Sequence, residues 1–569
     1  MDRNLILALT LSMAVLVTWS AWKARRQVPQ RTREQLAVEA PGARSPLGPD
    51  LSSRPTQNDG DYTPSTAASS ADPALGQTVS ELPEWRRLFS RRLYDAELTS
   101  RGAALVRWTL KEYTESANEG EIPIELLSLQ APHSLALRTP FRELGLGDLG
   151  EAVYTTERSD AAGASFVLRR GGVSIRKSYA FSDDHYGLEL EIEIANQSQR
   201  AIHPRFEVLW PAAVRTSPDF KEQSLVSLHG GTVARTLVAR VGVPSLFARL
   251  AGKRDSGASV TTFEDGIEWA GVDDRYFVSV LVPDRPELAQ VTFEPLVKGK
   301  IAGARLSFEP VELAPGQSVT RAFRGYLGPK VPELLEETGA DLTQSINRGY
   351  FWSRPLAGFF EWLLCTCYAV VPNYGVCILI LTLLVRGVTL PILSRQMRST
   401  ERMRELQPKL KEIQEEFQDD RARQSKATMA LYREAGVNPM GGCLPMLLQM
   451  PIFIGLFYAL RSSVELRHAP FALWITDLSA PEALFTIAGI GLSVRLLPLL
   501  MAGSMVLQQK VQPTPTGDPS QARMMQNVMP VMMTFLFYSF PSGLVLYYLT
   551  SNLLAVGHQL WLRHRLLAT

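Results

Sequence analysis

The stretch CILILTLLVRGVTLPIL, residues 377–393, decides how this chain is organised. It is apolar over the length of a membrane helix except at Arg386, and Thr382 lies one helical turn earlier, so both side chains share a helix face. A charge at hydrocarbon depth is costly and usually faces a protein interior or a water-filled cavity. Alternatively, Arg386 marks the cytoplasmic end of the helix and extends to the lipid headgroups. The stretch alone leaves both interpretations open.

More apolar runs follow, and the last of them predicts a fold-back. The run from Met524 to Leu562 contains no Lys, Arg, Asp or Glu. As one helix it would measure about 58 Å, nearly twice the hydrocarbon thickness of about 30 Å. We therefore predict a turn at Pro541-Ser542-Gly543. The expected spans in this half of the chain are residues 362–386, 440–461, 496–509, 524–540 and 543–562.

Two neighbouring segments are amphipathic or charged. Residues 350–361 are rich in aromatic residues and carry Arg354 and Glu361, which predicts a helix lying in the membrane interface. Residues 394–436 are highly charged and predict a two-helix cytoplasmic hairpin with a turn at residues 418–420; a solvated linker is the alternative. The apolar stripe of this hairpin consists of Leu406, Leu410, Ile413 and Phe417.

The first 345 residues contain a further apolar run, a linker and a β domain. Residues 1–23 are predicted to form a transmembrane anchor. A cleavable signal peptide is the alternative, but Trp19 and Trp22 are typical of the aromatic belt at the interfacial end of a membrane helix. Residues 24–83 are rich in Pro, Ser and Ala and are expected to be disordered. Residues 84–345 alternate apolar and polar positions, which predicts an antiparallel β-sandwich.

These segments together predict a multi-domain membrane protein. Its six-span α-helical core would combine the anchor with five further helices, and a large β-sandwich domain would lie between them. The basic loops after Arg386, at Lys510–Arg523 and at Arg563–Arg565 fall on one side, which is therefore expected to be cytoplasmic. Six spans then place both termini in the cytoplasm and the β domain outside it.

Several chemical functions find no support in the sequence. The net charge of +2 gives no case for nucleic-acid binding. No Gly-Lys-Ser/Thr phosphate loop occurs, and Gly145-x-Gly147-x-x-Gly150 follows no buried strand. The four cysteines lie in or beside apolar helices without metal-ligand spacing; they are Cys365, Cys367, Cys377 and Cys443. We therefore predict no cofactor, no metal and no catalytic residue, so the chain is not expected to be an enzyme.

Three segments resemble the YidC family of membrane-protein insertases, in its Gram-negative form. They are LLVRGVTLPI (383–392), the run from NPMGGCLPMLLQMP to ALWITDLS (438–479) and FPSGLVLYYLTSN (540–552). The opening MDRNLILAL is also similar. One departure is that residues 486–495 make this loop longer than is usual in the family.

The resemblance implies a five-helix core around a hydrophilic groove that is open to the cytoplasm and to lipid. In that groove Arg386 would be the positive charge, and Thr382, Gln449, Tyr547 and Tyr548 would line it or contact a client helix. The implied activity is insertion and folding of newly made inner-membrane proteins, alone or with the Sec translocon. The implied partners are nascent membrane proteins, the ribosome and membrane lipids, with no nucleic acid bound directly.

Two other functions are compatible with parts of the sequence. A secondary transporter also has broken helices and a polar residue at depth, but the sequence shows no inverted repeat. An envelope protein that binds sugars through its β domain is the second alternative. The histidines that would serve it are scattered, with no carboxylate partner evident; they are His133, His185, His203 and His229.

Overall fold

The computed structural model describes residues 83–115, 122–129, 135–213, 223–238, 260–264, 266–297, 301–418, 420–436, 444–487, 492–511 and 528–567. The chain divides into two compact units, Met1–Thr78 and Val79–Thr569. The predicted anchor (1–23) and nearly all of the predicted linker (24–83) lie outside the described residues.

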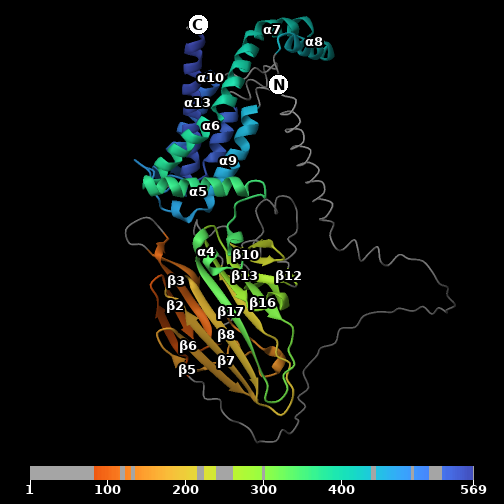
Figure 1. Cartoon of the computed structure of the whole chain (residues 1–569), viewed down its shortest axis with the longest axis vertical. Coiled ribbons are helices and arrows are strands. Elements are labelled where there is room, and N and C mark those ends of the chain that lie inside the picture. The colour runs from red at the N-terminus through yellow and green to blue at the C-terminus, as the bar shows by residue number, and fades with distance from the viewer. Residues whose placement is uncertain are drawn as a thin grey trace, which may run out of the picture. The chain divides into compact units, whose positions relative to one another are not determined.

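The largest element of the second unit is a nine-stranded antiparallel sheet with the order β11-β10-β13-β14-β17-β8-β7-β6-β5 (Figure 1). Alternation of apolar and polar residues produces these strands: along β8, burial alternates so that Leu190, Ile192 and Ile194 face the core. The strands are β5 (Thr155–Ser159), β6 (Gly163–Arg170), β7 (Val173–Phe181), β8 (Gly187–Asn196), β10 (Ser224–His229), β11 (Thr232–Leu237), β13 (Ile267–Asp273), β14 (Phe277–Pro283) and β17 (Ser318–Pro329).

Two four-stranded antiparallel sheets complete the β domain. One contains β1 (Arg86–Ser90), β2 (Tyr94–Thr99), β3 (Ala104–Thr114) and β4 (Pro123–Ser128). The other, ordered β12-β15-β16-β9, contains β9 (Glu207–Ala213), β12 (Thr261–Phe263), β15 (Ala289–Val297) and β16 (Ile301–Phe308). Short 3-10 helices occur at η2 (Arg142–Leu144) and η5 (Pro286–Leu288).

All three sheets contribute to one hydrophobic core. Trp108 from β3, Trp210 from β9 and Trp269 from β13 are each fully buried and belong to the same cluster. Tyr94 of β2 stacks on Trp108 with ring centroids 3.9 Å apart. Since the sheets share this core between their inner faces, the domain is the predicted antiparallel sandwich.

The β domain ends with α4 (Pro332–Thr338) and η6 (Leu342–Ser345), and helices follow. They are α5 (Arg354–Val370), α6 (Tyr374–Glu405), α7 (Gln407–Glu416), α8 (Arg421–Glu434), α9 (Leu444–Ser462), α10 (Leu496–Val511), α12 (Met529–Phe537) and α13 (Ser542–Leu567). Between α9 and α10 lie η8 (Val464–Leu466) and a hairpin of β18 (Phe485–Ile487) and β19 (Leu492–Val494).

The predicted span 362–386 is wrong at its start. α5 continues to Val370, and the chain then breaks at 371–373 before α6 begins. Pro372 explains the break, because the residue before a proline disfavours helical geometry. The helix predicted for residues 350–361 instead runs from Arg354 to Val370, and Figure 1 shows it running across the direction of α6.

The charged hairpin also begins later than predicted. α6 runs without interruption to Glu405, so residues 394–405 extend that helix. The turn before α8 is stabilised by Asp420, whose Oδ1 accepts hydrogen bonds from the N–H groups of Ala422 and Arg423. Leu410 packs with Met403 and Tyr432 in a small core. The apolar stripe thus serves in part as the inside of the hairpin.

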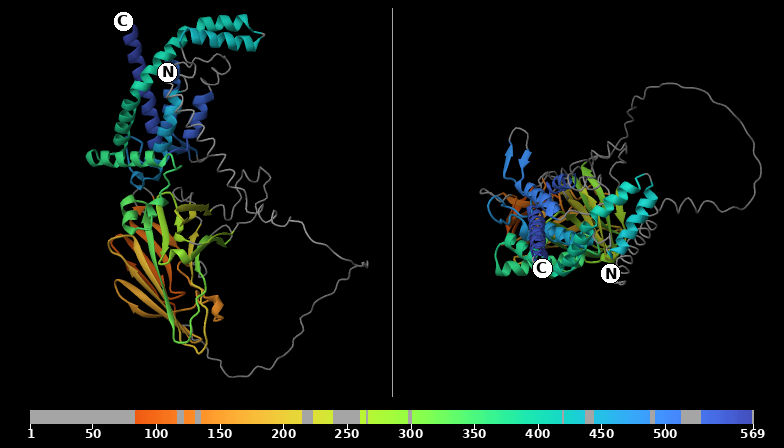
Figure 2. Two further views of the ribbon diagram at one scale, coloured as in Figure 1. Left: turned by 45° about the vertical axis from the view of Figure 1, so that its right-hand side comes forward. Right: turned by 90° about the horizontal axis from the view of Figure 1, so that it is seen from above.

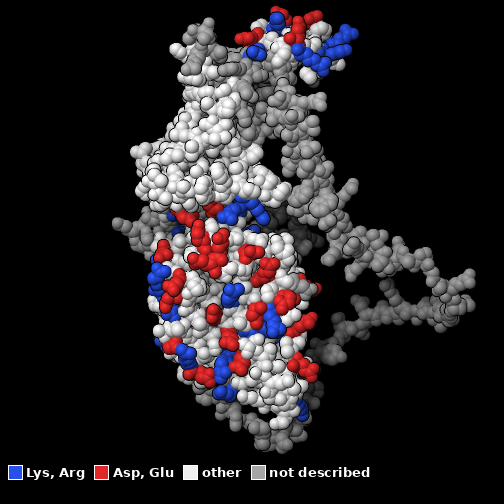
Figure 3. Space-filling view, in the orientation of Figure 1, with Lys and Arg blue, Asp and Glu red and all other residues white. Residues whose placement is uncertain are grey.

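Among the described residues, one helical segment is long and apolar enough to cross a membrane, Tyr374–Pro391; Leu496–Val511 is a shorter apolar helix. The six-span count is therefore not established by helix length. Figure 3 shows Lys, Arg, Asp and Glu gathered over the β domain and over α7 and α8. The visible face of the described helices between them carries few charges, as a lipid-facing surface requires.

Candidate functional site

Helix α13 packs against α6, α9 and α10, and its polar residues join it to each of them. The Nε of Arg386 on α6 donates a 2.8 Å hydrogen bond to the Oγ of Ser551. The Nε2 of Gln449 on α9 donates to the hydroxyl of Tyr547 at 2.9 Å. Because Tyr547 and Ser551 lie one helical turn apart, both bonds leave the same face of α13.

A third bond leaves α13 toward α10. The Nδ2 of Asn552 donates to the Oγ of Ser504 at 3.2 Å, and both side chains are buried. Ser504 was missed by sequence reasoning, since a single serine in an apolar helix carries no distinctive pattern. Together the three bonds join α13 to α6, α9 and α10, so α13 is the central helix of the site.

The predicted site residues differ in exposure. Tyr548 is partly exposed, and its ring lies edge-on to Phe453 with centroids 6.1 Å apart. Tyr547 is only 1% exposed. Thr382 is fully buried, and its hydroxyl donates to the carbonyl oxygen of Ile378 in its own helix at 2.6 Å. Thr382 is therefore not exposed in this conformation, and its expected part in lining the groove or contacting a client stays a prediction.

A cavity of about 560 Å³ adjoins Arg386 between α6 and α13. Its walls are apolar apart from Arg386 and His558. The lining residues are Leu383, Arg386, Gly387, Leu390, Leu553, Leu554, Ala555, Gly557, His558 and Trp561. His558 was also missed by sequence reasoning, although it is the only histidine in the run from Met524 to Leu562. Its Nε2 lies 3.4 Å from the Oγ of Ser394.

The charge of Arg386 is not neutralised within the part of the chain that the structure describes. There Ser551, a neutral hydroxyl, is its hydrogen-bonding partner, and no carboxylate forms an ion pair with it. The side chain is partly exposed beside the cavity. Such a site can attract a carboxylate from another molecule, because an opposite charge offsets the cost of holding a cation at low dielectric.

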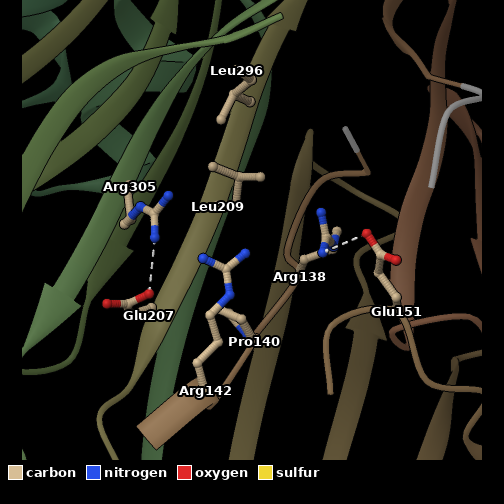
Figure 4. Close-up of a pocket in the computed structure, with 8 residues that line it drawn as sticks. All are labelled: Arg138, Pro140, Arg142, Glu151, Glu207, Leu209, Leu296 and Arg305. Carbon is tan, nitrogen blue, oxygen red and sulfur yellow. Dashed lines mark hydrogen bonds and ion pairs between the residues drawn. The ribbon is translucent and has the colours of Figure 1, made fainter. Parts of the chain in front are cut away.

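The β domain holds a second pocket, of about 200 Å³ (Figure 4). The Arg305 NH1 group lies 3.0 Å from Glu207, and the Arg138 NH2 group lies 3.3 Å from Glu151. Arg142 points into the space between these pairs and binds Asp148 at 3.1 Å. Each arginine of the pocket is thus already paired with a carboxylate, which leaves this pocket without an unneutralised charge like that of Arg386.

Among the described residues, the candidate histidines of the β domain do not line this pocket. His133 lies outside the described residues, and His185, His203 and His229 are absent from the pocket lining. The Nδ1 of His185 lies 2.8 Å from the Oγ of Ser182. In the described part of the chain, no group of three or more His, Cys, Asp or Glu side chains is arranged to hold a metal ion.

Two family models match consecutive parts of the chain. The YidC periplasmic domain matches residues 89–363, and the 60Kd inner membrane protein matches residues 366–568. The chain belongs to the YidC family of membrane protein insertases. The family consists of non-enzymatic insertases of the bacterial inner membrane with a periplasmic domain, in agreement with our prediction that the chain is not an enzyme.

Individual relatives cover the whole chain. A membrane protein insertase YidC from Syntrophus aciditrophicus is 32% identical over 581 residues, covering 99% of each chain. The corresponding protein of Pelobacter propionicus is 33% identical over 575 residues, again covering 99% of each. A crystal structure of an active YidC insertase is 18% identical, with a TM-score of 0.35, and covers 83% of this chain and 91% of its own.

Proposed function

We propose that this chain inserts newly made membrane proteins into the inner membrane and helps them fold, with Arg386 receiving acidic residues of the client. The observation that carries the proposal is the guanidinium of Arg386, which lies in an apolar helix beside a cavity and is bonded to a neutral hydroxyl. A transporter would instead be expected to show paired halves, and the family match favours insertion.

The electrostatic part of the mechanism follows from this uncompensated charge. At about 4 Å and an effective dielectric constant of about 20, a carboxylate and a guanidinium attract by about 4 kcal/mol. A client's acidic residue entering from the cytoplasm would thereby be held partway across the membrane. Tyr548, which is partly exposed, would contact the client, whereas Gln449 and Tyr547 would form the hydrogen-bonded wall of the groove. Thr382 would support α6 from inside.

Release into lipid would be driven by apolar burial. Each Å² of apolar client surface that leaves water contributes about 25 cal/mol, so a transmembrane helix moves outward without a nucleotide. The membrane potential adds about 2.3 kcal/mol per charge per 100 mV for an acidic tail that moves to the outer side. Insertion driven in this way requires a path into the membrane and a charge that binds the client transiently, and it requires no covalent chemistry.

The proposed topology has six spans, with both termini cytoplasmic and the β domain periplasmic. This arrangement is supported by the basic character of the loops at 394–436 and 510–523 and of the C-terminal tail. It places the α7–α8 hairpin on the side where nascent chains and ribosomes arrive. Cooperation with the Sec translocon and direct contact with lipids belong to the same proposal.

The test is insertion by purified protein in liposomes that maintain a membrane potential. Wild type, Arg386→Lys and Arg386→Ala are compared on single-span clients with acidic translocated tails and on matched clients with neutral tails. Lysine keeps the charge, so Arg386→Lys should retain most activity. Arg386→Ala should lose at least about tenfold on acidic tails, the equivalent of about 1.4 kcal/mol, because the attraction to the carboxylate disappears.

The neutral-tail client is the control for folding. A variant that is merely unfolded would lose insertion of both clients, whereas loss of the charge should affect chiefly the acidic one. Equal insertion of acidic tails by wild type and Arg386→Ala would show that Arg386 does not receive client carboxylates.

A further inference from the structure

The loop between α9 and α10 contains an apolar β-hairpin, β18–β19, in the region where this chain is longer than expected for the family. Phe485 pairs with Val494 and Ile487 with Leu492, and the N–H of Leu484 donates to the carbonyl oxygen of Val494 at 2.9 Å. Residues 483–494, ALFTIAGIGLSV, contain no charged side chain. An isolated two-stranded hairpin is only marginally stable in water. This hairpin therefore needs support from another surface.

The base of the hairpin is tied to the helix that follows it. The Oε1 of Glu482 accepts a 2.5 Å hydrogen bond from the N–H of Leu497, in the first turn of α10. A carboxylate is favourable there, since it satisfies a free N–H group and complements the helix dipole. The two strands therefore have a defined position relative to the start of α10.

The other strand is tied to the end of α12. The Tyr538 hydroxyl donates to the carbonyl oxygen of Ser493, and Arg495 donates to the carbonyl oxygen of Tyr538. The guanidinium of Arg495 also lies 4.8 Å from the centre of the Tyr538 ring. These contacts hold the base of the hairpin, while its strands extend away from the helices, as the blue arrows in Figure 2 show from above.

Both the hairpin and α10 expose large apolar side chains. Leu484 is 44% and Phe485 55% exposed, and on α10 Leu499 is 52% and Leu500 44% exposed. α10 has 16 residues. Its length of about 24 Å falls short of the hydrocarbon thickness of about 30 Å. The residues just before α10 should therefore lie at or slightly below the boundary between acyl chains and headgroups.

We infer that the β18–β19 hairpin is a membrane-interface anchor, whose exposed side chains Leu484 and Phe485 insert among the phospholipids of the outer leaflet. The inference rests on the proposed membrane orientation of α10. Leucine and phenylalanine are suited to this depth. A two-stranded sheet has outer edges with unpaired N–H and C=O groups, which exclude it from the hydrocarbon centre but are satisfied among headgroups and water. Insertion there would fix the outer end of α10, the helix whose Ser504 bonds Asn552 of α13 further along.

The test measures where Phe485 lies in the full-length protein. The four natural cysteines are replaced by serine, single cysteines are introduced at three positions and spin-labelled, and the protein is placed in phosphatidylethanolamine–phosphatidylglycerol liposomes. The ratio of the spin label's collisions with oxygen to its collisions with a water-soluble nickel chelate rises with the depth of the label in the membrane. Leu499 on α10 serves as the lipid reference, and Leu288, which is 41% exposed in the β domain, as the water reference.

We expect the ratio at Phe485 to approach that at Leu499 and to exceed that at Leu288 several-fold. A ratio at Phe485 equal to that at Leu288, with Leu499 in lipid, would overturn the anchor while leaving the proposed function intact. If Leu499 also gave the water value, the membrane placement of α10, and with it the proposed function, would fail.

A second measurement identifies the occupant. A photoreactive amino acid at position 485 should form adducts with phospholipid in membranes that are synthesising client proteins. Adducts with a client, or with a second copy of this chain, in place of phospholipid would overturn the anchor. The same probe at position 288 is the matched control and should give neither.

Discussion

The hydrogen bond between Gln449 and Tyr547 allows a structural role to be separated from client contact. Sequence resemblance assigned both residues to the client groove, whereas the structure joins them to each other at 2.9 Å and leaves Tyr547 only 1% exposed. We expect a double-mutant cycle with Gln449→Leu and Tyr547→Phe to show an energetic coupling. Phenylalanine keeps the ring and leucine keeps most of the volume, so each change removes mainly the polar group.

The expected magnitude follows from the site of the bond between α9 and α13. Interhelical hydrogen bonds within membranes contribute on average about 0.6 kcal/mol and at most about 1.7 kcal/mol in such cycles. The bond is short and Tyr547 is buried, so a coupling of about 1 kcal/mol is expected. Each single variant leaves one polar group without its partner, and the double variant should therefore be about as stable as the less stable single variant.

The assay is equilibrium unfolding of the four proteins in mixed micelles, followed by insertion measurements on the same samples. The Asn552–Ser504 pair is the matched control: its longer bond of 3.2 Å predicts a smaller coupling. Zero coupling between Gln449 and Tyr547, combined with a tenfold loss of insertion by stably folded single variants, would refute this reasoning. In that case the two residues would act on the client and not on each other.

Two further predictions concern the β domain and the charged hairpin. Burial raises the pKa of Asp274 to about 7, so its carboxyl group contributes stability that is present below about pH 4 and is lost as the pH rises through about 7. Between pH 4 and 7 the unfolding free energy of wild type should therefore fall by up to about 4 kcal/mol relative to that of Asp274→Asn. Parallel curves for the two proteins, or an equal effect of the control Asp284→Asn, which changes an exposed carboxyl group, would contradict this. A photoreactive residue at the exposed position Lys411 on α7 should capture shorter nascent chains than one at Tyr548, and the reverse order would exclude the hairpin as the entry point.

Local chemistry in the sequence accounts for much of the fold. Alternation predicted strands such as β8, because a half-buried strand must place apolar residues at every second position. Asp420, in the predicted turn at residues 418–420, caps the start of α8 with its side chain. The structure also breaks the last apolar run near Pro541, where the run was too long for one span. Pro372 was an equally local signal of a helix break, but the uncharged residues on both sides of it favoured the interpretation of one continuous span.

Residue patterns along the chain are enough to show that a cation lies in an apolar helix and that polar residues recur on the last helix. Which of these residues contact one another depends on how the helices pack in three dimensions. Arg386 and Ser551 are 165 residues apart in sequence, and Gln449 and Tyr547 are 98 apart. The rotation of each helix about its axis, which sets Thr382 inside and Tyr548 partly outside, comes from packing against several neighbours at once. Helical periodicity shows which residues share a face, but the fit between distant helices determines where that face points.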